Sequence, residues 1–195
     1  MKIIGLTGPT GSGKTTVALF AQSKGFAVID CDKVAREATE KGSRVLPELC
    51  KAFGDGILYH DGSLNRKELA NRAFCDKKST ERLNAIILPH IVKLITEKTE
   101  RLKNDGVDRL LLDAPTLFES GLDSICDSVV AVLCPDEIRK ERIIKRDGLT
   151  EAQADTRLKA SRPYDFYTSR TPHIVVNDGD ETEFLNRISQ IFGEL

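Results

Sequence analysis

Residues 8–16 of this chain read GPTGSGKTT, and this stretch decides the fold that we expect. Every fixed position of the phosphate-binding pattern G-x-x-x-x-G-K-[ST] is filled, by Gly8, Gly13, Lys14 and Thr15. The apolar run at 2–7 precedes the pattern as a first strand would, and residues 17–21 follow it with apolar side chains at helical spacing. Strand, glycine loop and helix are the context that this pattern requires.

The loop predicts a site for a nucleoside triphosphate with Mg²⁺. Glycines at 11 and 13 let successive N–H groups turn inward, at the positive end of the following helix. Lys14 is then expected to reach the β- and γ-phosphates, and the Thr15 hydroxyl to ligate Mg²⁺. The predicted phosphate contacts are Gly11, Ser12, Gly13, Lys14, Thr15 and Thr16. A chance glycine turn is the alternative, and the flanking pattern disfavours it.

The composition fits one α/β domain of 195 residues, with 40% hydrophobic and 30% charged residues. The net charge of −1 indicates neither a nucleic-acid binder nor a polybasic membrane protein. No apolar run is long enough for a bilayer span, and the start lacks a signal-peptide pattern. The five cysteines show no C-x-x-C spacing, so we expect reduced thiols and a cytoplasmic protein.

A second strand at 26–29 ends on Asp30 and Asp32. Because ligands of parallel sheets bind beyond the carboxyl ends of the strands, both acids are candidates for catalysis or substrate binding. Either may equally cap the next helix. Arg36 follows Asp32 by four residues, hence on the same helical face, as an ion-pair partner or a phosphate ligand.

Residues 41–102 are predicted to be almost entirely helical, with Ser43 and Ser79 as caps and Pro89 as a kink in the longest helix. This stretch is longer than an ordinary crossover between strands. We interpret it as an insertion that binds the acceptor, and a plain structural crossover is the alternative.

The third strand, at 109–113, ends on Asp113, which we expect to help hold Mg²⁺. Glu119 follows, either at the mouth of the site or as a turn cap. After a fourth strand at 128–134, a helix carries Arg139, Arg142 and Arg146 on one face. That face is either a solvated surface or part of a lid over the phosphates, at about 139–170.

A last strand at 173–177 ends on Asn177, which either frames the adenine or only reverses the chain. Five strands interleaved with helices predict a doubly wound parallel sheet. A GTP-dependent switch is a further alternative, but we find no N-K-x-D motif for guanine.

Taken together, the motifs resemble those of the dephospho-CoA kinase family. The resemblance covers nearly the whole chain and rests on GLTGPTGSGKTT at 5–16, D-x-D-x-x-x-R at 30–36, LNRKELANRAF at 64–74, LLDAPTLFESGL at 111–122, RDGLT at 146–150 and IVVNDG at 174–179. It implies a P-loop kinase fold with a helical substrate domain and a lid. It also implies phosphorylation of the ribose 3′-hydroxyl of dephospho-CoA by ATP, giving coenzyme A.

The resemblance assigns roles to particular residues. It implies that Asp32 is the catalytic aspartate, Arg36 its companion and Arg146 a lid arginine that acts with Lys14. The chain departs from the family at Ser161, where glutamine is common, and at Leu88 and Pro172. The implied partners are ATP and dephospho-CoA, and we expect a monomer or weak homo-oligomer. Another P-loop kinase, for a nucleoside or a shikimate-like acid, is the alternative.

Overall fold

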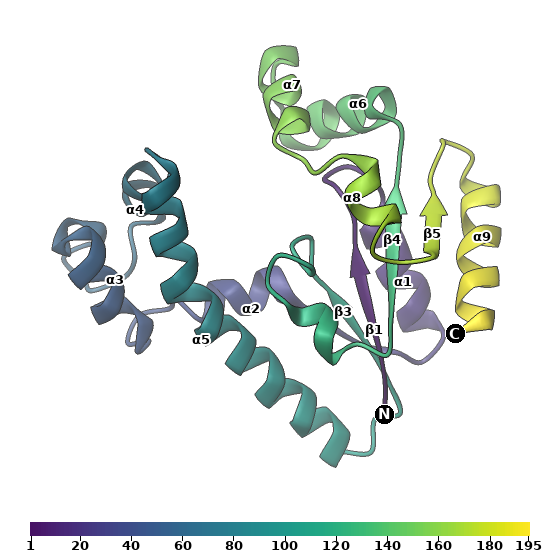
Figure 1. The fold of residues 1–195 in the computed structure, drawn as a ribbon, viewed down its shortest axis with the longest axis horizontal. Helices are drawn as coiled ribbons and strands as arrows, with labels where there is room; N and C mark the ends of the chain where they lie inside the picture. Colours follow the sequence, from purple (N-terminus) through teal and green to yellow (C-terminus); the bar gives the residue numbers. More distant parts are fainter. The chain divides into compact units, whose positions relative to one another are not determined.

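The computed structural model describes residues 1–195 and divides into two compact units (Figure 1). The first unit contains residues 1–29 and 106–195, and the second contains residues 30–105. The insertion expected at 41–102 falls within the second unit, and its acceptor-binding role stays a prediction. None of the helices combines the length and apolar character that crossing a bilayer requires.

The first unit is built on a five-stranded sheet in the order β2-β3-β1-β4-β5. The strands are β1 (Lys2–Thr7), β2 (Ala27–Asp30), β3 (Arg109–Asp113), β4 (Ser128–Leu133) and β5 (His173–Val176). β1 pairs in parallel with β3 and with β4, and β4 pairs in parallel with β5. The predicted five-stranded parallel sheet is therefore confirmed, and its strands deliver their carboxyl ends to one edge.

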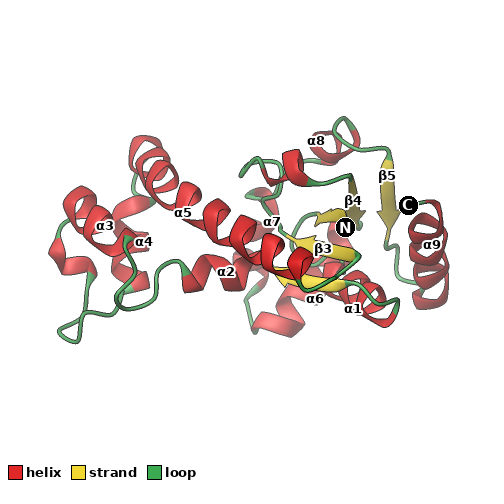
Figure 2. Ribbon diagram, turned by 90° about the horizontal axis from the view of Figure 1, so that it is seen from below, coloured by secondary structure: helices red, strands yellow, loops and turns green.

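Helices cover both faces of this sheet (Figures 1 and 2). α1 (Lys14–Ser23) and α9 (Glu181–Glu194) pack on one face, and α8 (Tyr164–Thr168) packs on the other. α6 (Asp136–Asp147) and α7 (Glu151–Lys159) lie beyond the carboxyl end of β4, and a 3₁₀ turn η2 (Leu122–Ile125) precedes that strand. Alternate side chains of β4 point to opposite faces, as the two-residue period of a strand dictates. Val130 and Val132 join a cluster with α1 and α9, whereas Ala131 and Leu133 pack with Tyr167 of α8.

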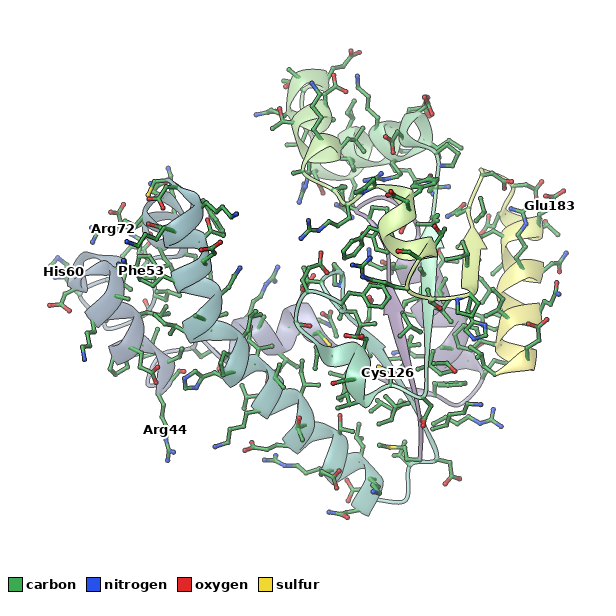
Figure 3. All side chains as sticks on the ribbon, viewed as in Figure 1. Arg44, Phe53, His60, Arg72, Cys126 and Glu183 are labelled. Carbon is green, nitrogen blue, oxygen red and sulfur yellow. The ribbon has the colours of Figure 1, made fainter.

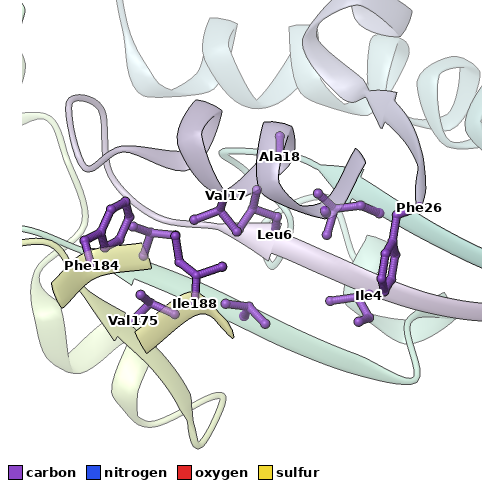
Figure 4. Close-up of a cluster of buried hydrophobic side chains, with 12 residues drawn as sticks. Ile4, Leu6, Val17, Ala18, Phe26, Val175, Phe184 and Ile188 are labelled. Carbon is purple, nitrogen blue, oxygen red and sulfur yellow. The ribbon is translucent and has the colours of Figure 1, made fainter. Parts of the chain in front are cut away.

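The larger cluster fixes α1, and with it the glycine loop, on the sheet (Figure 4). Ile4 and Leu6 of β1 are fully buried beneath Val17 of α1, and Phe184 and Ile188 of α9 close the same cluster. Burying a side chain of this size contributes about 1.5–3 kcal/mol. The start of α1 is therefore held by apolar packing on both α9 and the strands.

The second unit is helical, as predicted, and has its own core. Its elements are α2 (Cys31–Glu37), α3 (Val45–Phe53), η1 (Asp55–Ile57), α4 (Arg66–Ala73) and α5 (Lys77–Asn104). The core consists of buried apolar residues from four of these elements and the loops near them: Val45, Leu46, Leu49, Ile57, Leu64, Leu69, Ala73 and Leu83. Arg72 of α4 donates from Nη1 to the Phe53 carbonyl at 2.6 Å and ties α4 to the end of α3 (Figure 3).

Local signals at helix ends were partly right. The T-E-A-Q run at 150–153 fits the sequence pattern of a capping box, and the structure forms that box between Thr150 and Gln153. Asp30 caps α2 by accepting from the Lys33 N–H at 3.0 Å. The prediction that Ser79 caps the long helix is wrong. Asp76 is the cap, and the Ser79 N–H donates to its Oδ1 at 2.7 Å. Both residues are good caps by type, so sequence preference alone does not separate them.

Candidate active site

The glycine loop lies between β1 and α1, at the carboxyl edge of the sheet. Gly8, Gly11 and Gly13 have φ angles of 137°, 78° and 105°, which only glycine adopts at little cost. Gly13 is the left-handed N-cap of α1, so the first N–H groups of the helix open toward the loop. Nζ of Lys14 donates to the carbonyls of Gly8 at 2.8 Å and Pro9 at 3.2 Å, which holds the ammonium across the loop.

Close packing explains two of these glycines independently of their φ angles. A Cβ on Gly8 would lie 2.2 Å from the Val132 carbonyl oxygen of β4. A Cβ on Gly13 would lie 2.3 Å from Nδ2 of Asn177. The loop is therefore pressed against the strands that flank it.

Three consecutive loop carbonyls accept hydrogen bonds from side chains outside the loop. Nε of Arg139 donates to Thr10 O at 2.8 Å, Nη1 of Arg142 to Gly11 O at 3.4 Å, and Nδ2 of Asn177 to Ser12 O at 2.8 Å. In a trans peptide the carbonyl and the following N–H point in opposite directions, and no peptide here is cis. Anchoring these carbonyls therefore fixes the orientation of the next N–H groups. The Ser12 N–H donates to Pro9 O at 3.3 Å within the loop, while the Gly11 and Gly13 N–H groups are turned away from α6 and β5, as a phosphate cradle needs.

The anchoring groups also bind each other. Nη2 of Arg142 donates to Oδ1 of Asn177 at 3.1 Å, and Nη1 lies 3.5 Å from Sγ of Cys134. Asn177 is 5% exposed and Arg139 is 2% exposed. Burial raises the pKa of the Cys134 thiol, which is therefore neutral beside these cations.

The predicted metal ligands are placed in the same unit as the loop. Asp113 ends β3, in register with Leu6 of β1, just before the loop begins. Thr15 is in the first turn of α1. A hydroxyl and a carboxylate are the hard oxygen donors that Mg²⁺ takes, and it commonly uses only one or two protein carboxylates with phosphates and water. The donor set present thus fits Mg²⁺.

Arg146, the expected lid arginine, is engaged with its neighbour. Its Nε and Nη2 donate to the two carboxylate oxygens of Asp147 at 2.7 and 2.9 Å, and Arg157 binds the same carboxylate. These cations hold the pKa of Asp147 below its usual range. The side chain of Arg146 is still 59% exposed. Arg146 does not contact the loop in this state, unlike Arg139 and Arg142.

Glu119 also has a partner within the first unit. Its Oε1 accepts from Nε of Arg162 at 3.1 Å, and the Arg162 guanidinium lies 5.1 Å from the ring centre of Phe166. Next to this contact, a hollow of about 540 Å³ opens between the start of α6 and the segment that joins α7 to α8. Arg139 and Ser161 both line it.

Asp30, Asp32 and Arg36 belong to the second unit. Asp30 is the cap of α2, whereas Asp32 and Arg36 lie on its exposed surface. The main-chain carbonyl of Arg36 accepts from Nη2 of Arg66 at 3.1 Å, which joins α2 to α4. The expectation that Asp32 faces the phosphates held over Lys14 stays a prediction.

Arg139 is the site residue whose role sequence reasoning missed. The sequence placed it on a basic face that was either solvated or part of a lid, and the structure buries it against the loop backbone. Thr10 lies 129 positions away and contributes only a main-chain oxygen, so no local pattern marks the contact.

The chain is similar to known proteins in sequence and in fold. The family model for dephospho-CoA kinase matches residues 2–183. The dephospho-CoA kinase of Anaeromyxobacter dehalogenans strain 2CP-C is 37% identical over 195 residues, which cover 100% of this chain and 92% of its own. Among solved structures, TT1252 from Thermus thermophilus superposes with a TM-score of 0.84 at 32% identity, covering 100% of this chain and 97% of that one. The dephospho-CoA kinase from Campylobacter jejuni, at 24% identity and a TM-score of 0.73 (100% and 97% covered), shares the fold.

Proposed function

We propose how the site works from one premise: the chain belongs to the dephospho-CoA kinase family, and it is a phosphotransferase that uses ATP and dephospho-CoA. The observation that carries the proposal is the anchored glycine loop, in which Arg139, Arg142 and Asn177 fix three successive carbonyls. Such a loop is preorganised for phosphate, and phosphoryl transfer depends mainly on positioning and electrostatics.

The ATP phosphates lie on the N–H groups of residues 11–16, at the positive end of α1. Lys14 already spans the loop through two carbonyls, and in the complex its ammonium moves to the β- and γ-phosphates. Asn177 and Arg142 support this site from outside by binding the loop backbone and each other. We assign them to nucleotide binding through the loop that they hold.

Thr15 and Asp113 are the residues that would hold Mg²⁺, Asp113 directly or through water. When bound, the ion neutralises charge on the phosphate oxygens. The structure contains no group of three or more His, Cys, Asp or Glu side chains that could hold a metal ion.

Asp32 accepts the proton of the acceptor hydroxyl and orients its oxygen for in-line attack. The bond from that oxygen to the γ-phosphorus forms as the bond to the bridging oxygen breaks, and ADP leaves. Asp30, the cap of α2, and Arg36, on the same short helix, contact the acceptor. Arg146 leaves Asp147 and spreads positive charge over the transferring group, while Glu119 lines the acceptor side.

The acceptor hydroxyl is the ribose 3′-hydroxyl of dephospho-CoA, and the product is coenzyme A. A nucleoside or shikimate-like acceptor is the second candidate, because its chemistry at the phosphate loop would be the same. We further propose a monomer or weak homo-oligomer that does not bind nucleic acid. The cytoplasmic location stays a prediction.

The test is incubation with ATP, Mg²⁺ and dephospho-CoA, followed by mass analysis of the products. The expected result is a gain of one phosphate on dephospho-CoA, with one ADP formed for each acceptor consumed. Shikimate and adenosine serve as comparison acceptors. Faster turnover of either comparison acceptor than of dephospho-CoA would reject the acceptor assignment.

A further inference from the structure

Arg139 is an arginine that the fold buries almost completely, with 2% of its surface exposed. Arginine is seldom buried in this way unless hydrogen bonds and an ion pair offset the loss of hydration. Arg139 lies at the end of the first turn of α6, a helix that also has exposed side chains such as Glu137 and Glu141. The partners that hold it inside are therefore informative.

The guanidinium binds three segments that are far apart in the chain. Nε donates to Thr10 O of the phosphate loop at 2.8 Å, and Nη1 pairs with Oδ1 of Asp136 in the first turn of α6 at 2.7 Å. Nη2 donates to Oγ of Ser161, in the segment that follows α7, at 2.8 Å. Only a planar fork with several fixed donors serves three such directions at once.

We propose that Arg139 is a positioning residue for phosphate binding: it fixes the Thr10–Gly11 peptide of the loop so that the Gly11 N–H faces the ATP phosphates. The inference rests on the proposed function and extends it to a residue that does not touch substrate. Asp136 and Ser161 hold the guanidinium in the orientation that this requires.

The rest of the loop shows why this peptide needs a support of its own. The Ser12 N–H donates to Pro9 O at 3.3 Å inside the loop, and the Ser12 carbonyl is held by Asn177. Gly11 has a φ of 78° and, as a glycine, adds no side chain to restrain the turn. A Cβ there would lie 3.1 Å from the Arg139 carbonyl oxygen, so α6 already touches the loop at this point. Without Arg139, the Thr10 carbonyl would lose this hydrogen bond and the Thr10–Gly11 peptide could rotate.

Two substitutions at the residue separate its charge from its geometry. Arg139→Met keeps an unbranched stem and removes every donor, and Arg139→Lys keeps the charge without the fork. Ser161→Ala removes one of the three partners and leaves Arg139 in place. Arg109→Met is the matched control, because Arg109 is an exposed arginine at the amino end of β3.

The measurements are the dissociation constants of ATP and of adenosine, with thermal unfolding as a check of folding. Arg139→Met should weaken ATP binding about tenfold, as expected for losing a charge-assisted hydrogen bond. Arg139→Lys should weaken it less and Ser161→Ala least. Adenosine binding should stay within about twofold in all variants, because adenosine lacks the phosphates that the loop binds. In steady-state kinetics of the Arg139 variants, KM for ATP should rise while KM for dephospho-CoA is unchanged.

If the affinities for ATP and for adenosine fall equally, the variants have lost structure in general and the proposal is overturned. Wild-type ATP affinity in variants that fold would also overturn it. If Arg139→Met does not fold, Arg139→Lys and Ser161→Ala decide by the same criteria. ATP binding needs no acceptor, so the test of Arg139 does not depend on the identity of the acceptor. If the wild-type protein binds ATP but does not phosphorylate dephospho-CoA, the proposed function is rejected and the role of Arg139 can still be tested.

Discussion

The side-chain amide of Asn177 donates a 2.8 Å hydrogen bond to the main-chain carbonyl of Ser12, across 165 positions of sequence. The contact joins the end of β5 to the phosphate loop, and the Asn177 amide is itself held by Arg142. A residue at a strand end that seemed to reverse the chain or frame a base thus supports the loop backbone.

Gly13→Ala should disrupt this contact and ATP binding. The new methyl group would lie 2.3 Å from Nδ2 of Asn177 and would force that side chain away from Ser12. We expect ATP affinity to fall at least about tenfold, in addition to roughly 1–2 kcal/mol of strain from the left-handed backbone. Titration calorimetry and thermal unfolding measure the two effects.

Gly25→Ala is the control for that substitution. Gly25 also has a positive φ, 86°, but nothing lies within 4 Å of a Cβ placed on it. This variant should lose stability and keep ATP affinity. If both variants lose ATP affinity equally, the clash with Asn177 is not the cause.

Lys14→Ala should reduce phosphate affinity and turnover together. It removes the ammonium that spans the loop through Gly8 O and Pro9 O, and with it the positive charge over the β- and γ-phosphates. Kinetics with varied ATP should show a higher KM and a lower kcat. Lys24→Ala, which changes the exposed end of α1, is the control. Unchanged kinetics in Lys14→Ala would contradict the role proposed for the phosphate loop.

Asp32→Asn should keep ATP binding and lower kcat by about two to four orders of magnitude, the range of general acid–base catalysis. The amide retains the size of the side chain and cannot accept the acceptor proton. Stopped assays of coenzyme A formation measure the loss, with Glu40→Gln on the exposed surface of the same unit as control. A wild-type rate in Asp32→Asn would rule out this residue as the base.

The cysteines should differ in reactivity toward iodoacetamide at pH 8. Burial, then the charges of Asp123 and Asp127, raise the pKa of Cys126 to about 12, so its reactive thiolate is scarce. Cys75 is exposed and should be alkylated first, while the buried Cys31 and Cys134 stay protected. Peptide mass spectrometry over time reads the order. If Cys126 is alkylated as fast as Cys75, the predicted order is wrong. The unfolded protein, in which all five cysteines react, is the reference.

Asp76 should stabilise α5 in a pH-dependent way. Hydrogen bonds from Ser79, Cys75 and the backbone lower its pKa from 3.8 to about 2. A carboxylate with a depressed folded-state pKa contributes stability above its unfolded pKa and loses it as the pH falls through the folded value. Asp76→Asn still caps the helix but does not titrate. The free energy of unfolding of the wild type, relative to that of this variant, should therefore decrease as the pH is lowered from about 4 to about 2. Urea titrations measure this difference, and a difference that does not change with pH would count against the role of Asp76 as a charged cap.

The sequence predicted the features that depend on neighbours in the chain. The glycine loop, the five strands and the Thr150 capping box follow from local patterns, and the structure has all of them. The choice between Asp76 and Ser79 as cap failed because it depends on the backbone angles where the helix begins. The contacts of Arg139 and Asn177 could not be predicted from the sequence, because their partners are main-chain oxygens more than a hundred positions away.

The attachment of α6 has a consequence for how a lid can open. Arg139 and Arg142 bind the phosphate loop from the first two turns of this helix, and a lid that swung from residue 139 would pull the loop carbonyls with it. If residues 139–170 act as the predicted lid, we therefore expect its hinge after Arg142. Arg146 lies beyond that point, so under this proposal it would move with the lid while Arg139 and Arg142 stay bound to the phosphate loop.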